Sequence, residues 1–270
     1  MRVDSNGVGI EYDVNGDGRP VILLHGFPDS GRLWRHQVPA LVDAGFRVIV
    51  PDQRGYGASD HPTDVDAYSI LYLAGDIAAV LDDCGVERAH VVGHDWGAAV
   101  AWALAAAFPD RVDHLAALSV GHPSGFMSAG LAQREKSWYM LLFQFPGVAE
   151  RWLSNDGWAN LREWMTHPDV DAVIADLEAT DSLTTGLNWY RANVAPESWV
   201  APPFELPPVA APTMGVWSSA DAHLLEAQMT ASSAYVSGAW RYERIDGAGH
   251  HLQLEEPDRV NELLVDFLPA

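Results

Sequence analysis

Asp95, Asp221 and His250 are the side chains whose types and order along the chain best suit covalent catalysis. Asp95 lies at the centre of Gly93–Gly97, a G-x-nucleophile-x-G pattern that holds its central residue at the apex of a strand-to-helix turn. A carboxylate there can attack saturated carbon and leave an ester that water cleaves, whereas a serine would leave a stable ether. An aspartate that only caps the next helix is the alternative. It does not account for the acid and histidine, which follow in the order of a catalytic triad.

The elements that must position these residues alternate between strands and helices. Apolar runs of strand length predict strands over Gly9–Val14, Val21–Leu24, Phe46–Pro51, Ala89–Val92, His114–Val120, Thr213–Trp217 and Trp240–Ile245. Helical patterns cover Leu33–Ala44, Ile70–Leu81, Ala98–Phe108 and the segment from Glu255 to Leu268. Such alternation implies right-handed crossovers and a mostly parallel sheet flanked by helices. Active sites of these sheets lie at the carboxyl ends of the strands, where all three candidates fall.

Two loops at this edge carry further candidates. His25–Pro28 directly follows a strand, and its glycine and proline can shape a loop whose backbone amides point at one spot. Together with the nucleophile turn, this favours an oxyanion hole made by the amides of Phe27 and Trp96 over an ordinary turn. In the second loop, we expect Asp52 and Arg54 to form an ion pair that braces the loop rather than to act in catalysis.

The alternation stops near Gly121. Residues 122–209 have a helical pattern rich in tryptophan, and we expect them to form an all-helical cap, or lid, inserted into a core made of residues 1–121 and 210–270. Helix breaks are expected at Pro146-Gly147, Asn155–Gly157 and His167-Pro168. The chain is expected to leave the cap at the proline cluster Pro202-Pro203 and Pro207-Pro208.

The cap holds two tyrosines, Tyr139 and Tyr190, each directly after a tryptophan. A phenol in an apolar lid still needs a hydrogen-bond partner, and a substrate oxygen is a candidate. The cap tryptophans suggest an apolar substrate, although most of them can be explained as the core of the lid itself.

Composition excludes several other functions. The 270 residues carry a net charge of -21, which disfavours binding to nucleic acid or to a membrane surface. One cysteine, Cys84, rules out an intrachain disulfide and fits a reducing compartment, and with no apolar signal segment we expect a cytoplasmic protein. No cofactor or metal is expected. The calcium-loop-like start at Asp13 would place its closing glutamate at Leu24, and His90 and His94 do not share a helical face.

The chain resembles the epoxide hydrolase family of the α/β-hydrolase superfamily over essentially its whole length. The resemblance is carried by HGFP (His25–Pro28), GHDWG (Gly93–Gly97), SWYMLLFQFPGVAE (Ser137–Glu150), GLNWYRAN (Gly186–Asn193) and GHHLQLEEP (Gly249–Pro257). It implies an α/β-hydrolase core with a helical cap. It also implies Asp95 as nucleophile, His250 as base, Asp221 as its orienting acid, and Tyr139 and Tyr190 as ring-opening acids.

The implied reaction is cofactor-independent hydrolysis of a small apolar epoxide by water to a vicinal diol. A haloalkane dehalogenase would use the same triad but needs ring N–H donors for the halide, and Phe27 has none. A catalytically silent, lid-gated binding protein would have no need of a base. His251, where relatives often carry an aromatic residue, is a second candidate for the base. The sequence leaves open the particular epoxide, the selectivity, which tyrosine delivers the proton, and whether the chain is a monomer or a homodimer.

Overall fold

The computed structural model describes residues 1–200 and 206–270. Its central feature is an eight-stranded sheet with the order β1-β2-β4-β3-β5-β6-β7-β8. The strands are β1 (Arg2–Ser5), β2 (Val8–Asn15), β3 (Arg19–Leu24), β4 (Phe46–Pro51), β5 (Ala89–His94), β6 (Val112–Leu118), β7 (Thr213–Ser218) and β8 (Trp240–Ile245). β2 pairs antiparallel with β1 and β4, and the remaining neighbours are parallel. The predicted mostly parallel sheet is confirmed.

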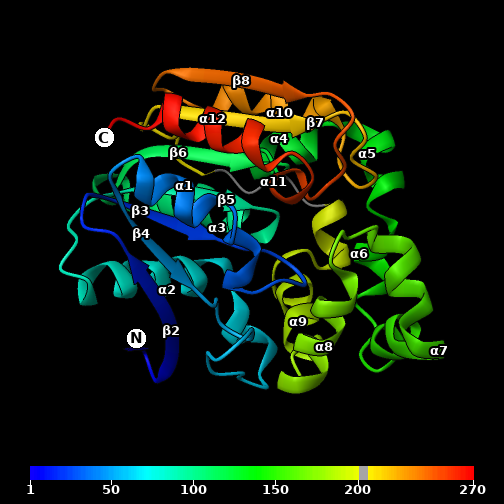
Figure 1. Ribbon diagram of the computed structural model, residues 1–270. Coiled ribbons are helices and arrows are strands. Elements are labelled where there is room, and N and C mark those ends of the chain that lie inside the picture. The colour runs from blue at the N-terminus through cyan, green and yellow to red at the C-terminus, as the bar shows by residue number, and fades with distance from the viewer. Residues whose placement is uncertain (201–205) are drawn as a thin grey trace.

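Helices cover both faces of the sheet, so that its central strands are apolar on both sides (Figure 1). On β3, Ile22 and Leu24 join the apolar cluster beneath α2 (Ile70–Asp83) and α3 (Trp96–Ala107). The alternate β3 residues, Val21 and Leu23, join the cluster beneath α1 (Gln37–Asp43) and α12 (Pro257–Phe267). This division follows from the period of two along a strand.

Shorter helical elements complete this core. They are the single helical turns η1 (Gly31–Trp34), η2 (Val65–Tyr68), η3 (Pro109–Arg111) and η5 (Ser232–Tyr235), with the helices α10 (Glu226–Ala231) and α11 (Leu252–Glu255). No helix within the described ranges is long and apolar enough to cross a membrane.

A run of helices is inserted between β6 and β7, as expected of a cap. It comprises α4 (Pro123–Ser128), α5 (Gly130–Lys136), α6 (Trp138–Leu142), α7 (Val148–Met165), α8 (Val170–Thr180), α9 (Leu183–Asn193) and η4 (Pro196–Trp199). Figure 1 shows α6 to α9 gathered beside the carboxyl ends of the parallel strands. The cap boundaries at residues 122 and 209 remain a prediction, and Pro202 and Pro203 of the expected exit lie outside the described residues.

The helix breaks expected in the cap coincide with irregular backbone. Gly147 precedes α7 with a φ of 72°, and Asn155 to Trp158 interrupt α7 with non-helical angles. The segment with His167 and Pro168 separates α7 from α8.

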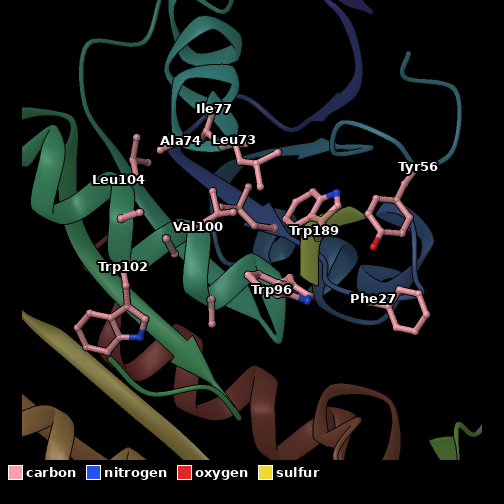
Figure 2. Packing of buried hydrophobic residues seen from close by; sticks show 14 of the residues in the cluster. Phe27, Tyr56, Leu73, Ala74, Ile77, Trp96, Val100, Trp102, Leu104 and Trp189 are labelled. Carbon is pink, nitrogen blue, oxygen red and sulfur yellow. The ribbon is translucent and has the colours of Figure 1, made fainter. Parts of the chain in front are cut away.

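Trp189 fastens cap helix α9 to the core. Its side chain is fully buried, and its Nε1–H donates to the carbonyl of Arg54 at 3.1 Å. Figure 2 shows this indole near Tyr56 and Trp96, and the ring centroids lie 5.6 and 5.9 Å away. Thr185 adds a hydrogen bond to the carbonyl of Gly55 at 2.6 Å. Tyr190, the neighbour of Trp189, is thereby held against the core.

Three local expectations differ from the structure. The edge strand β1 was not expected, because Arg2–Ser5 has one apolar residue and no clear alternation. The helical segment expected over Leu33–Ala44 is divided into η1 and α1. The ion pair expected between Asp52 and Arg54 was wrong. Asp52 instead accepts hydrogen bonds from the backbone amides of Gly31 and Ala58.

Arg54 forms its ion pair with Asp76 of α2. The guanidinium donates to both carboxylate oxygens at 2.8 and 2.6 Å, and both side chains are about 95% buried, with exposures of 5% and 3%. A two-point contact of this kind satisfies the geometry of both planar groups. It holds the loop on which α9 docks.

We expect Asp76→Ala to destabilise the protein by about 3–5 kcal/mol, because it leaves the Arg54 guanidinium buried without a partner. Equilibrium unfolding in urea measures the change. The double variant Arg54→Met with Asp76→Leu is the matched control and should recover much of the loss. A single variant within about 1 kcal/mol of wild type would show that this pair does not brace the loop.

Candidate active site

The turn that carries Asp95 brings the carboxyl end of β5 directly into α3. Asp95 has a φ of 51° and a ψ of -124°, an unusual backbone for a residue with a side chain. The crossing is tight, because a Cβ added to Gly97 would lie 2.0 Å from the carbonyl oxygen of Leu24 on β3. Only glycine fits there, which explains the second glycine of the motif.

The two carboxylate oxygens of Asp95 face different partners. Oδ1 accepts a hydrogen bond from the backbone N–H of Phe27 at 2.9 Å. Gly26 permits this approach, since a Cβ on it would lie 2.3 Å from Oδ1. Burial alone would raise the pKa of Asp95, but the nearby His250 and His94 and the N–H of Trp96 lower it below its usual value. The group is therefore a carboxylate, and 13% of its side chain remains exposed.

His250 lies between Asp95 and Asp221. Its Nδ1 is 2.9 Å from Oδ2 of Asp221, and its Nε2 is 3.6 Å from Oδ2 of Asp95. Burial would lower the pKa of His250, but the two carboxylates outweigh it and raise the pKa to about 10. The resting site therefore holds an imidazolium between two anions.

Asp221 is held from its own loop and from the cap. Its Oδ1 accepts the backbone N–H groups of His223 and Leu224 at 2.8 and 2.9 Å. Lys136 of α5 donates to the Asp221 carbonyl at 2.9 Å. Burial would raise the pKa of Asp221, but the contact with His250 and the N–H of His223 lower it below its usual value.

Supporting residues that the sequence reasoning missed fix the backbone of His250. Its carbonyl lies 2.9 Å from Nε2 of His94 and accepts the hydroxyl of Ser119 at 3.0 Å. His25 braces the opposite loop, because its Nε2 accepts the N–H of Gln53 at 2.9 Å while its Nδ1 lies 3.0 Å from the carbonyl of Gly26. His94 and His25 adjoin motif glycines, which was the available signal, whereas Ser119 has no such neighbour.

Tyr139 and Tyr190 lie together on the cap side of the site. Their ring centroids are 6.1 Å apart, and the ring of Tyr190 meets those of Phe27 and Trp96 edge to face at 5.6 and 5.1 Å. Burial raises the pKa of both phenols well above the usual value, and the negative charge of Asp95 raises it further. Both are therefore proton donors at neutral pH.

A hollow of about 460 Å³ opens close to Tyr139. Trp138, Trp164 and His223 are among the residues that line it. The rings of Trp164 and His223 also contact Tyr139, with centroids 4.8 and 5.6 Å from its ring. These two side chains therefore contact both the hollow and the ring of Tyr139.

His251, the second candidate for the base, contacts Asp29 and His167. Its Nε2 lies 3.8 Å from Oδ2 of Asp29, and its ring centroid lies 4.1 Å from that of His167. Asp29, His167 and His251 form the set within the described ranges that could hold a metal ion, with one atom from each residue within 4.8 Å of the others. The distances to both carboxylates favour His250 as the base.

Comparisons with known proteins identify the fold and the family of the chain. Residues 19–257 match the family model described as the alpha/beta hydrolase fold. The chain is 36% identical to epoxide hydrolase A of Mycobacterium tuberculosis, over 98% of this chain and 96% of that protein. A crystal structure of a Bacillus megaterium epoxide hydrolase with an inhibitor is 29% identical with a TM-score of 0.90, covering 99% of both chains.

A second solved structure holds a product. It is a single-residue variant of an epoxide hydrolase from Bacillus megaterium complexed with its naphthyloxy-propane-1,2-diol product, with a TM-score of 0.87, 28% identity and coverage of 99% of both chains. The sheet and inserted helices define an α/β hydrolase. Within that fold, the chain belongs to the epoxide hydrolase family.

We expect His250 to remain protonated through neutral pH and to lose its proton near pH 10, as measured by nitrogen-15 NMR titration. Because this pKa exceeds the ~6.5 of an unfolded histidine, the stabilisation is complete below about pH 6.5 and is lost as pH rises towards 10. In Asp95→Asn the pKa should fall, since only Asp221 remains as an anionic partner. Titration near pH 6.5 in both proteins would contradict the charge arrangement.

Proposed function

We propose that this protein hydrolyses apolar epoxides to vicinal diols through a covalent ester on Asp95, with no cofactor. The observation that carries the proposal is the grouping of these side chains. Asp95 accepts the Phe27 amide, and Tyr190 packs on Phe27 and Trp96 with Tyr139 beside it. His250 lies between Asp95 and Asp221. An epoxide needs these groups together, because its carbon requires a nucleophile and its oxygen requires an acid.

Ring opening would use Oδ2 of Asp95, the oxygen that faces His250 and accepts no backbone amide. Oδ1 of Asp95 is engaged by the Phe27 amide, so Oδ2 is the atom that attacks a ring carbon. As the carbon–oxygen bond breaks, the departing oxygen takes a proton from Tyr139 or Tyr190. The phenolate that remains regains a proton from the imidazolium of His250. Asp95 is then an ester, and His250 is a neutral base.

This charge change prepares the second step. Ester formation removes the negative charge of Asp95, one of the two charges that raise the pKa of His250. The neutral imidazole, oriented by Asp221, removes a proton from water as the water oxygen attacks the carbonyl carbon of the ester. The amides of Phe27 and Trp96 stabilise the resulting oxyanion on Oδ1. As the intermediate collapses, the remaining proton of the attacking water passes to the departing alkoxide oxygen. The diol leaves, and the carboxylate of Asp95 and the imidazolium of His250 are restored.

The walls of the site suit an apolar substrate. Phe27, Trp96 and Phe143 are buried and place aromatic surface around Tyr190. The relative from Bacillus megaterium was solved with a naphthyloxy-diol product, which supports an aryl-substituted epoxide as the first substrate to test.

Haloalkane dehalogenation is the rival reaction. The nucleophile and base would be unchanged, but a departing halide needs N–H donors, and of the two oxyanion residues only Trp96 has a ring N–H. A phenol pair whose pKa is raised suits an oxygen leaving group better. A catalytically silent binding protein would not require a histidine held between Asp95 and Asp221.

We expect a single turnover of a styrene-type epoxide in heavy-oxygen water to give diol and to place the label in the carboxylate of Asp95, because water attacks the ester carbonyl. Mass spectrometry of the proteolytic peptide containing Asp95 measures the label, and a parallel assay measures halide release from a haloalkane. Diol formation with no label in Asp95 would exclude the covalent route, and halide release without diol would favour the rival.

We expect the double variant Tyr139→Phe with Tyr190→Phe to lower the rate of ester formation by about 10²–10⁴-fold, the range for loss of general acid catalysis. Stopped-flow tryptophan fluorescence with excess epoxide follows that step. Tyr72→Phe is the matched control, since that tyrosine is 55% exposed and lies outside the site. A double variant as fast as this control would show that the phenols do not assist ring opening.

A further inference from the structure

The proposed mechanism does not use a buried polar cluster beside the active site. We call Asp29, His167 and His251 the Asp29 cluster; their relative exposures are 7%, 6% and 0%. Nε2 of His167 lies 3.2 Å from Oδ1 of Asp29, and Nε2 of His251 lies 3.8 Å from Oδ2. His167 belongs to the cap segment between α7 and α8, whereas the other two residues belong to the core. The cluster therefore joins cap and core away from water.

The tautomer of His167 decides between a metal site and a polar contact of its ring N–H with the Asp29 carboxylate. Nδ1 of His167 accepts the backbone N–H of Asp169 at 2.9 Å, so this nitrogen carries no proton. The neutral ring must then carry its proton on Nε2, the nitrogen that faces Asp29. A metal-bound histidine has the opposite pattern, because it binds through an unprotonated nitrogen and donates from the other. The 3.2 Å approach to Oδ1 of Asp29 lacks the geometry of a hydrogen bond, but as a close polar contact it suits a protonated nitrogen better than a metal ligand.

Asp29 also closes the turn that carries an oxyanion donor. Its backbone N–H donates to the carbonyl of Gly26 at 2.9 Å, which makes Gly26–Asp29 a closed four-residue turn. Phe27 is the second residue of this turn, and its N–H points at Oδ1 of Asp95. A shift of the Asp29 side chain therefore moves the end of the turn that aims this amide.

We propose that His167 and Asp29 are positioning residues through which the seated cap holds the Phe27 amide in the oxyanion hole. The inference rests on the proposed function. His251 packs against both partners and against the ring of His94, whose centroid is 5.5 Å away, and it keeps the contact dry. Core–cap ion pairs nearby, such as Arg32 with Asp176 at 3.6 Å, are exposed and contribute little.

The two chemical steps should respond differently to loss of this contact. The Phe27 amide stabilises charge that develops on Oδ1 only when water attacks the ester. During ring opening, Oδ1 instead loses negative charge. A displaced amide therefore slows ester hydrolysis and spares ester formation, so that the covalent intermediate accumulates.

Rapid-quench mass spectrometry of the intact protein with excess styrene-type epoxide tests the inference. The amplitude of ester formation gives the concentration of active enzyme. The rate constants of both steps are therefore unaffected by any inactive, misfolded protein. We expect His167→Phe, which keeps ring volume but has no N–H, and Asp29→Ala to slow ester hydrolysis about tenfold. This is less than the 10²–10³-fold for deleting an oxyanion donor. Ester formation should change by less than about twofold, because its charge flow does not depend on that donor.

Conservative variants provide the rescue and the control. His167→Gln retains a side-chain N–H and Asp29→Asn retains an acceptor oxygen, so each should recover most of the lost rate. Asp176→Asn removes an exposed core–cap ion pair and should behave as wild type. Equal slowing of both steps, or no slowing in His167→Phe, would overturn the inference. One equivalent of zinc retained by the wild-type protein after dialysis with chelator and lost in His167→Phe would also overturn it.

The outcome is separable from that of the proposed function. If wild-type protein forms no ester and no diol, the proposed function fails. If wild type turns over and His167→Phe shows the same partition between the two steps, only the positioning role fails.

Discussion

The active site depends on keeping an imidazolium between two carboxylates largely out of water. Asp221 and His250 have side-chain exposures of 0% and 5%, and a lone charge at such depth would be costly. Each ion offsets the energetic cost of burying its neighbour. Backbone amides donate hydrogen bonds to the remaining carboxylate oxygens. The same contact links stability to catalysis in the proposed mechanism, because neutralising Asp95 changes how tightly His250 holds its proton.

The fold supplies this arrangement at the edge where the parallel strands end. β5 carries Asp95 at its carboxyl end. The 118 residues from 95 to 212 separate β5 from β7, and the loops after β7 and β8 carry Asp221 and His250. The cap then closes the site through buried contacts rather than through surface charge. Trp189 places Tyr190 over the nucleophile turn, and Lys136 holds the loop of Asp221. The contacts that hold the cap on the core therefore also position residues of the active site.

Local features of the sequence could be predicted because their causes are local. The Asp95 turn needs glycines at fixed offsets, and the breaks near Gly147 and Asn155 need residues that leave the helix. The strands buried on both faces are continuous apolar runs. β1 lacks that signal, because it has only four residues and most of them are polar; pairing with β2 makes it a strand.

Contacts between distant segments could not be read in the same way. The partner of Arg54 is Asp76 of α2, and nothing in the loop sequence distinguishes it from nearby Asp52. His94 and Ser119 support His250 from two different strand ends, and the Asp29 cluster combines three separate segments. Tyr139 and Tyr190 stand out in the sequence as phenols in an apolar cap, but only the family resemblance implies their role as acids, because the spacing of cap residues does not reveal how the helices pack on the core.

The most direct test of the central claim is a search for the ester in a His250→Gln variant. Without the base, ring opening on Asp95 should proceed while hydrolysis stalls. Mass spectrometry of the intact variant after incubation with an epoxide should show one adduct of the mass of the whole epoxide per chain, located on the peptide with Asp95. An unmodified variant that still yields diol would contradict the account, because water would then attack the epoxide directly.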